Sequence, residues 1–298
     1  MPKTTNKPFP PTAVILGFLL LPVITMSACS GKMEAEAPLP PVKTQPRELY
    51  STERADLFDR YTVAGIEQGS YLKIHEHPSL TSPVLGEILP SGIAIIPSGE
   101  IYQDDDSVWA YITHDESEGW VNMEFLAEQH GSLPEELILL GQQIVKLLKD
   151  GQYSQMVPHI DPNSCLRFSP YQYLNNDNRI ICPMEIENYI KSEEIINWGQ
   201  YDGTGKPIDL TFNEYHQQFV YDRDYQKPAV VGFNCEVSSG NSINNIQEIY
   251  PDGMMIEYYF PGFDPQYGGM DWRSLRLVFV PVNDHWYLAA IIHGEWTI

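Results

Sequence analysis

Between positions 61 and 129 the chain alternates short apolar runs with turn-forming residues. In the run from Val108 to Ile112, large apolar side chains alternate in the way a half-buried strand requires. The candidate strands are 71–74, 84–89, 93–96, 108–112 and 119–121. Several short strands at this spacing predict an all-β unit, a small barrel, over residues 58–129.

The pattern changes to helical spacing after position 132. Ser132 and Glu135 form a capping-box sequence with Pro134 in the first turn, and Gly151 is a natural stop. A helix is therefore predicted over 133–150. Its apolar stripe consists of Leu137, Leu140, Ile144, Leu147 and Leu148.

The remainder of the chain predicts an α+β domain over 132–298. A short helix is expected over 183–192, and the capping box Thr211-Phe212-Asn213-Glu214 opens another that reaches about Val220. Strands are expected over 241–249, 254–260, 275–281 and 286–292, the last two as a hairpin. Helices followed by strands predict a curved antiparallel sheet covered by helices. This order resembles the cone of the nuclear-transport-factor-two-like family.

Residues 1–28 predict a bacterial signal peptide. Lys3 and Lys7 supply the positive charge, and the apolar stretch 13–24 is too short for a permanent membrane span. The tetrapeptide Met26-Ser27-Ala28-Cys29 resembles the lipobox of bacterial lipoproteins. That resemblance implies cleavage before Cys29, a diacylglycerol on its sulfur and acylation of the new amino terminus, because several acyl chains anchor durably.

Residues 29–57 predict a lipidated cysteine followed by a Pro-rich tether. The lipobox resemblance implies a cell-envelope location and a membrane partner reached through covalent lipid. Ser30 resembles the outer-membrane-sorted class if the host has two membranes. In a host with one membrane, the anchor would lie in the outer face of the cell membrane.

The net negative charge of the chain makes some classes of partner unfavourable. With 298 residues, enough for about two domains, the chain carries 40 acidic and 18 basic side chains, or −22. Loss of Lys3 and Lys7 with the leader leaves 40 against 16, or −24. Such a field repels nucleic acid and anionic lipid, and it also serves solubility.

Several segments of the first unit resemble the bacterial Src homology 3 domain. They are 72–74, 78–79, 84–89, Gly92, 109–112 and 119–121. The resemblance implies a ligand among cell-wall peptides or other proteins, or a role as a spacer. Trp109, Tyr111 and Trp120 are the candidate ligand-binding residues. The alternative role of both tryptophans is packing in the core and at its rim.

The second unit resembles a module of uncharacterised bacterial lipoproteins, a resemblance that implies no activity. It rests on the segments 167–171, 198–203, 260–273 and 291–298. Asp271, Arg273, Arg276 and His293 are candidate pocket residues on the curved sheet. In the alternative interpretation, residues 260–276 form an ordered loop held by an Asp271–Arg273 pair.

The three cysteines other than Cys29 would lie in an oxidising compartment. Cys165 and Cys182 flank the expected hairpin and are the preferred disulfide pair, although a turn at 175–178 would not place them opposite each other. The sharper alternative is a catalytic pair of Cys235 with one of the histidines His159, His216 or His293.

No familiar catalytic or metal motif occurs. The Asp104-Asp105-Asp106 run is expected to be a solvated turn, and His75 with His77 would not close a metal site. We therefore expect no cofactor and no metal. The sequence predicts a lipid-anchored, non-enzymatic binding or scaffolding protein whose partner is peptidoglycan or an envelope protein. The alternative is a small-molecule-binding protein or enzyme with its pocket in the α+β module, and a third is a surface structural protein without a ligand.

Overall fold

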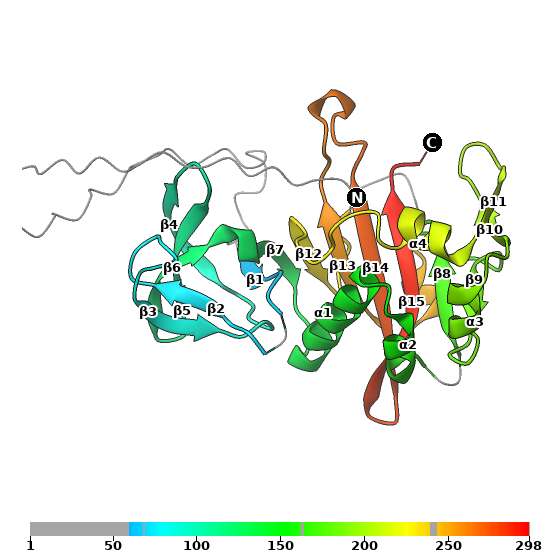
Figure 1. Cartoon of the computed structure of the whole chain (residues 1–298), viewed down its shortest axis with the longest axis horizontal. Coiled ribbons are helices and arrows are strands. Elements are labelled where there is room, and N and C mark those ends of the chain that lie inside the picture. Colours follow the sequence, from blue (N-terminus) through cyan, green and yellow to red (C-terminus); the bar gives the residue numbers. More distant parts are fainter. Residues whose placement is uncertain (1–59, 68, 162–163, 239–242, 298) are drawn as a thin grey trace, which may run out of the picture. The chain divides into compact units, whose positions relative to one another are not determined.

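A computed structural model describes residues 60–67, 69–161, 164–238 and 243–297 (Figure 1). Within these residues the chain is mostly β, with a five-stranded sheet, an eight-stranded sheet, a two-stranded hairpin and few helices. The expected leader, Cys29 and tether lie outside the described residues. No helix in the described part is long and apolar enough to cross a membrane.

The five-stranded sheet is antiparallel, with the strand order β3-β2-β6-β5-β4. Its strands are β2 Leu72–His75, β3 Val84–Ile88, β4 Ile96–Gln103, β5 Val108–His114 and β6 Ser117–Asn122. Alternate side chains face a small apolar core that includes Ile74, Ile88, Ile112 and Val121. The alternation seen at 108–112 therefore corresponds to a real strand.

The expected closed barrel is not formed. Within the described residues β3 and β4 are the two edges of an open sheet. The chain just before β4 pairs instead with incoming residues: Tyr61 N donates to Ile95 O at 2.9 Å, and Ile95 N donates to Tyr61 O at 3.0 Å. A register shift between Pro97 and Ile101 also interrupts the β4–β5 pairing. The strand expected at 93–96 consequently begins at Ile96.

The eight-stranded sheet has the order β1-β7-β12-β13-β14-β15-β8-β9. Its strands are β1 Tyr61–Val63, β7 Leu126–Gly131, β8 Leu166–Ser169, β9 Arg179–Ile181, β12 Val230–Phe233, β13 Met254–Phe260, β14 Arg273–Val282 and β15 His285–Glu295. It is mixed rather than antiparallel, because β12 runs parallel to β7 and β15 parallel to β8. Parallel neighbours need long crossovers, which the helical segments provide. Strands β1 and β7 flank the five-stranded sheet in sequence and join it to the larger sheet.

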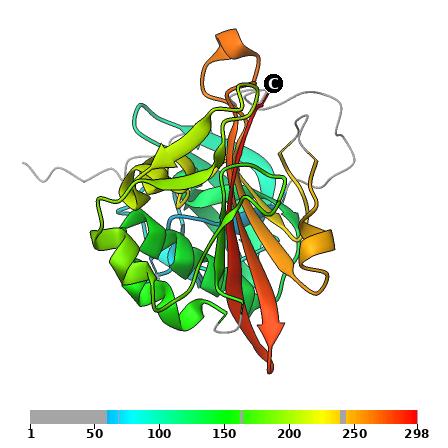
Figure 2. The same cartoon turned by 90° about the vertical axis from the view of Figure 1, so that its right-hand side faces the viewer.

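Helices cover one face of the larger sheet. They are α1 Glu135–Lys149, α2 Tyr153–Met156, α3 Ile186–Lys191 and α4 Phe212–Phe219. Seen side-on, the green helices lie on one side of red β15, and the orange segment with α5 (Ile246–Ile249) lies on the other (Figure 2). The stripe of α1, including Leu137, Ile144 and Leu148, enters the main core with Ile256 and Leu277.

Two local expectations can be compared directly with the structure. The Thr211–Glu214 capping box is present. The Ser132 box is not, because α1 starts after Pro134 without a side-chain cap and Glu135 accepts a hydrogen bond from Ser91 Oγ at 2.8 Å.

The strand expected over 241–249 is wrong for the described residues 243–249. Asn245 uses its side chain to bind the backbone N–H and carbonyl of Leu174, at 2.8 and 2.9 Å, and α5 follows it. A side chain that bonds so completely to a loop competes with strand pairing. The remaining elements are the β10 Ile196–Gln200 and β11 Pro207–Leu210 hairpin and the short 3₁₀ turns η1 Met123–Phe125, η2 Val157–His159 and η3 Pro265–Tyr267.

Candidate ligand-binding cleft

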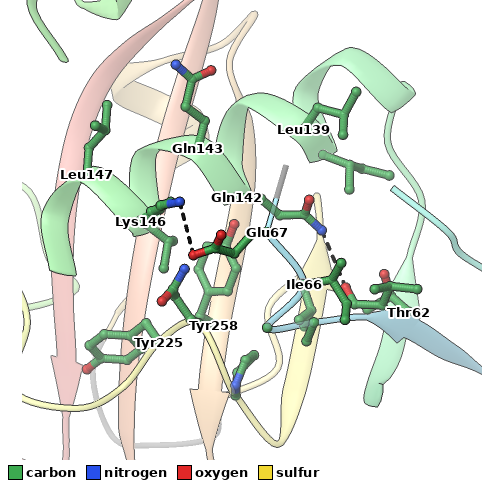
Figure 3. A pocket seen from close by; sticks show the side chains of 18 of the residues that line it. Thr62, Ile66, Glu67, Leu139, Gln142, Gln143, Lys146, Leu147, Tyr225 and Tyr258 are labelled. Atoms are coloured by element: carbon green, nitrogen blue, oxygen red, sulfur yellow. Dashed lines mark hydrogen bonds and ion pairs between the residues drawn. The ribbon is translucent and has the colours of Figure 1, made fainter. Parts of the chain in front are cut away.

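A cleft of about 420 Å³ lies between α1, the segment after β1 and the strands β12 and β13. Figure 3 shows Gln142 and Lys146 reaching from α1 toward the segment that carries Ile66 and Glu67. Its apolar walls include Val63, Ile138 and Phe233. Clefts of this size accommodate small organic ligands.

Contacts between distant segments hold the walls in place. Gln142 Nε2 donates to Pro90 O at 2.6 Å and to Val63 O at 3.4 Å. Lys146 Nζ lies 3.3 Å from Glu67 Oε1 at the mouth (Figure 3). This ion pair is exposed and contributes little to stability. The hydrogen bonds donated by the Gln142 side-chain amide and the pairing of β1 with β7 therefore hold the segment after β1 in place.

Gly141 sets the distance between α1 and β13. A Cβ atom on Gly141 would lie 2.4 Å from Ile256 Cδ1 and 2.8 Å from the hydroxyl of Tyr258. Such distances are too short for real contacts, so any side chain at position 141 would force the ends of Ile256 and Tyr258 to shift. A glycine in a helix interior costs roughly 1 kcal/mol relative to alanine. At this position, glycine allows α1 to lie close to Tyr258 of β13.

Tyr258 is the unusual residue of the cleft. Its side chain is 95% buried, and its hydroxyl forms no hydrogen bond with any described residue although it lines the cavity. Burial raises the pKa of Tyr258, so the group stays protonated and can donate as well as accept. The hydroxyl therefore has an unused donor inside the cleft, and a ligand with a hydrogen-bond acceptor would engage it.

The lining residues offer binding groups rather than a catalytic pair. Glutamine amides are frequent among them, and none of the lining residues is a histidine, cysteine or serine. Lys146 is already paired with Glu67. The chemistry therefore fits a neutral ligand with an apolar body and polar ends.

The aromatic candidates of the five-stranded sheet divide into two groups. Trp109 is only 2% exposed, packs edge-on against His75, and donates from Nε1 to Ser107 Oγ at 2.8 Å. It is therefore a core residue and not a ligand contact. Tyr111 and Trp120 are half-buried cross-strand neighbours whose rings meet edge-on at 5.5 Å.

The four polar candidates do not form one pocket. Arg273 and His293 face the helices, whereas Arg276, three residues further along β14, faces the opposite side, where it pairs with buried Glu257 at 3.0 Å. The side chains of a strand alternate, so residues three apart point in opposite directions. Asp271 instead accepts hydrogen bonds from the backbone of residues 263 and 264. Residues 260–273 thus form an ordered loop, but without an Asp271–Arg273 side-chain pair.

Arg273 and His293 belong to an ionic network around Asp222. Arg273 lies 3.2 Å from both Asp222 and Glu295, and His293 Nε2 lies 3.6 Å from Asp222. Burial acts to raise the pKa of Asp222, but the nearby His293 ring, a hydrogen bond from the Tyr225 hydroxyl and the charge of Arg273 outweigh it, and the net pKa is lowered. Arg273 is thus paired with two carboxylates, which is an arrangement that stabilises the structure.

Cys165 and Cys182 form a disulfide, with Cα atoms 4.4 Å apart. They lie opposite each other because β8 and β9 pair Leu166 with Ile181, a register that leaves a long loop over 170–178. Cys235 is a free, half-buried thiol whose pKa is raised by burial.

The catalytic alternative for Cys235 is not supported. The three candidate histidines have other partners: His159 contacts Gln143, His216 contacts Tyr153, and His293 contacts Asp222 and the carbonyl of residue 170. A burial-raised thiol pKa also disfavours the nucleophilic thiolate.

In the described part of the chain, no group of three His, Cys, Asp or Glu side chains could hold a metal ion. Asp104 Oδ1 accepts from the backbone of Asp106 and Ser107, so this end of the acidic run is a hydrogen-bonded turn.

No family model, curated protein or solved structure significantly matches this chain. The cleft residues were missed from sequence because they come from four separated segments. One signal was available: Gly141 interrupts the α1 stripe at a position where helical sequences favour alanine.

Proposed function

We propose that this protein is a lipid-anchored, non-enzymatic binding protein of the cell envelope that holds a small neutral ligand in the cleft beneath α1. The observation that carries the proposal is the hydroxyl of Tyr258, which lines the cleft and bonds to no described residue. The ligand would have an apolar body, and a carbonyl or ether oxygen would accept from Tyr258.

The sequence supplies the rest of the proposal. The lipobox-like segment before Cys29 supports anchoring, and the Pro-rich residues that follow support a tether. The five-stranded unit would be a divergent Src homology 3-like domain, on the strength of segments such as 109–112 and 119–121.

The binding test uses prodan, a neutral fluorescent naphthalene that carries a carbonyl acceptor. Purified full-length chain should shift its emission to the blue on binding. Tyr258→Phe should weaken binding about five- to tenfold, because one hydrogen bond is lost. Tyr215→Phe is the matched control, since it removes a tyrosine hydroxyl that also has no hydrogen-bond partner among the described residues but lies outside the cleft. Equal weakening in both variants, or no blue shift at all, would reject the cleft as the binding site.

Anchoring is tested separately by cell fractionation. The chain should remain with membranes, and Cys29→Ser should move it to the soluble fraction. Mass spectrometry of the membrane form should show a lipid on an amino-terminal Cys29. An unmodified residue 29 in mature protein would contradict the anchor without affecting the cleft.

A second candidate function uses the Tyr111–Trp120 pair, half-buried on the five-stranded sheet. This face would contact peptidoglycan or an envelope protein, for which aromatic anchors are suited. Deletion of 58–129 is a poor test, because it would also remove β1 and β7 from the larger sheet. Trp120→Ala should instead lower retention on purified cell wall, whereas the exposed-tyrosine control Tyr267→Ala should not. Equal retention of both variants would count against this face.

A further inference from the structure

A second depression, of about 520 Å³, lies between two loops at the other end of the eight-stranded sheet. One loop, 170–178, joins β8 to β9, and the other, 201–205, is the turn of the β10–β11 hairpin. The hairpin lies beside β8 and β9 in Figure 1. The segments 167–171 and 198–203, which stand apart in the sequence, therefore meet here.

The depression is rigidly built. The backbone N–H of Asp202 donates to the hydroxyl of Tyr171 at 3.2 Å, which connects the two loops. Asn178 Nδ2 donates to Ser169 Oγ at 3.1 Å inside the first loop. The Cys165–Cys182 disulfide closes the base of the same loop. A loop that is already ordered loses little conformational entropy when a ligand binds.

Tyrosine rings form the apolar part of the lining. Tyr171 and Tyr201 both pack against buried Phe219. Their ring centroids lie 6.1 and 6.2 Å, respectively, from that of Phe219, and both tyrosines are only half-buried. Tyr173 is 50% exposed on the same loop. Such rings offer flat faces to a ligand, and Phe219 fixes two of them in place.

Polar groups with free hydrogen-bonding capacity surround these rings. Gln200, Asp177 and Asp202 line the depression, and their side-chain polar atoms bond to no described residue. The amide donates and accepts, and the two carboxylates accept only. Planar aromatic faces next to acceptor-rich side chains match a molecule with an apolar ring face and a rim of hydroxyl groups.

We infer that this depression binds a neutral saccharide. Sugar ring faces would lie on Tyr171 and Tyr201, and hydroxyl groups would donate to Asp202 and Asp177. The two carboxylates repel phosphorylated or uronic ligands. An apolar ligand would leave Gln200 and the carboxylates without partners. The site is separate from the cleft at Tyr258 and does not depend on what that cleft binds.

The test is isothermal titration calorimetry of the purified full chain in a detergent that lacks a sugar headgroup. The probes are the neutral tetrasaccharides chitotetraose, cellotetraose and maltotetraose, the anionic tetragalacturonate, and trilysine as a basic peptide. At least one neutral tetrasaccharide should bind with a Kd of about 1 mM or tighter, and tetragalacturonate should not. Binding of trilysine alone would show a basic-peptide site and overturn the saccharide inference.

Variants locate the binding. Tyr201→Ala should weaken saccharide binding about tenfold. Gln200→Ala, at an exposed position, should weaken binding about threefold or more. Tyr267→Ala, an exposed tyrosine outside both cavities, is the matched control and should bind as the parent does. Unchanged binding in Gln200→Ala and Tyr201→Ala together, or no binding of any neutral probe near 10 mM, would overturn the inference.

Discussion

The two sheets of this protein are stabilised differently. The core of the five-stranded sheet consists of apolar side chains such as Ile74, Ile112 and Val121. The eight-stranded sheet also buries Arg276 and Glu257 completely, and a disulfide joins its last two strands. The cost of removing these two charges from water is offset by their pairing and by the backbone N–H groups that donate to Glu257. Apolar packing therefore stabilises the small sheet, whereas an ion pair and a disulfide also constrain the large one.

The largest expected effect is loss of one partner of the buried ion pair. Glu257→Ala should destabilise the protein by about 3–5 kcal/mol, because Arg276 keeps its charge in a buried site. Urea unfolding measures the change. The double variant Glu257→Leu with Arg276→Met should recover most of the loss. Arg276 Nη2 also lies 2.8 Å from Glu236 Oε1. A single-variant cost below about 1 kcal/mol would show that Glu236 compensates, and that the large sheet does not depend on the Glu257–Arg276 pair.

Removal of the disulfide should have the next largest effect. The cysteines are 17 residues apart, so Cys165→Ala with Cys182→Ala should cost about 3 kcal/mol. Thermal and urea unfolding of this variant are compared with Cys235→Ala, which removes a free thiol. If both variants lose the same stability, the covalent link is not the source of the effect.

Acid should destabilise the large-sheet region through His216. Burial lowers the pKa of His216 to about 4 in the folded state, where its Nδ1 lies 2.7 Å from the Tyr153 hydroxyl. Between that value and the unfolded pKa near 6.5, the unfolded chain binds more protons, so stability falls as pH falls. The expected loss from pH 7.5 to 4.5 is about 2–3 kcal/mol. His216→Gln should reduce this slope, and an unchanged slope would contradict the assignment.

The small sheet should respond to packing changes alone. Ile112→Val removes one methylene from its core and should cost about 1 kcal/mol. The cost should be the same at pH 7.5 and pH 4.5 and under reducing conditions, as measured by urea unfolding. A strongly pH-dependent cost would mean that the two regions are not stabilised by different means.

Local rules predicted the elements that local interactions determine. The Thr211 capping box and the strand 254–260 are present as expected, because each depends on neighbours in sequence. The strand expected at 275–281 begins earlier, at Arg273. Both Arg273 and Arg276 therefore lie within one strand. Because side chains alternate along a strand, these two residues, three apart, point to opposite faces of the sheet.

Features that depend on distant segments were not predictable from local pattern. The opposition of Cys165 and Cys182 depends on a register set by the long loop 170–178. The cleft depends on β1 joining a sheet whose other strands come from the second half of the chain. Neither the cysteine register nor the cleft could be predicted from the spacing of residues along one sequence.

The most direct test of the central claim is an experimental structure of the full chain purified from its own host, inspected for density around Tyr258. The account predicts a bound molecule in the cleft, with an acceptor atom about 2.7–2.8 Å from the Tyr258 hydroxyl. A cleft filled only by ordered water that bonds to this hydroxyl would contradict the proposal that it is a ligand site.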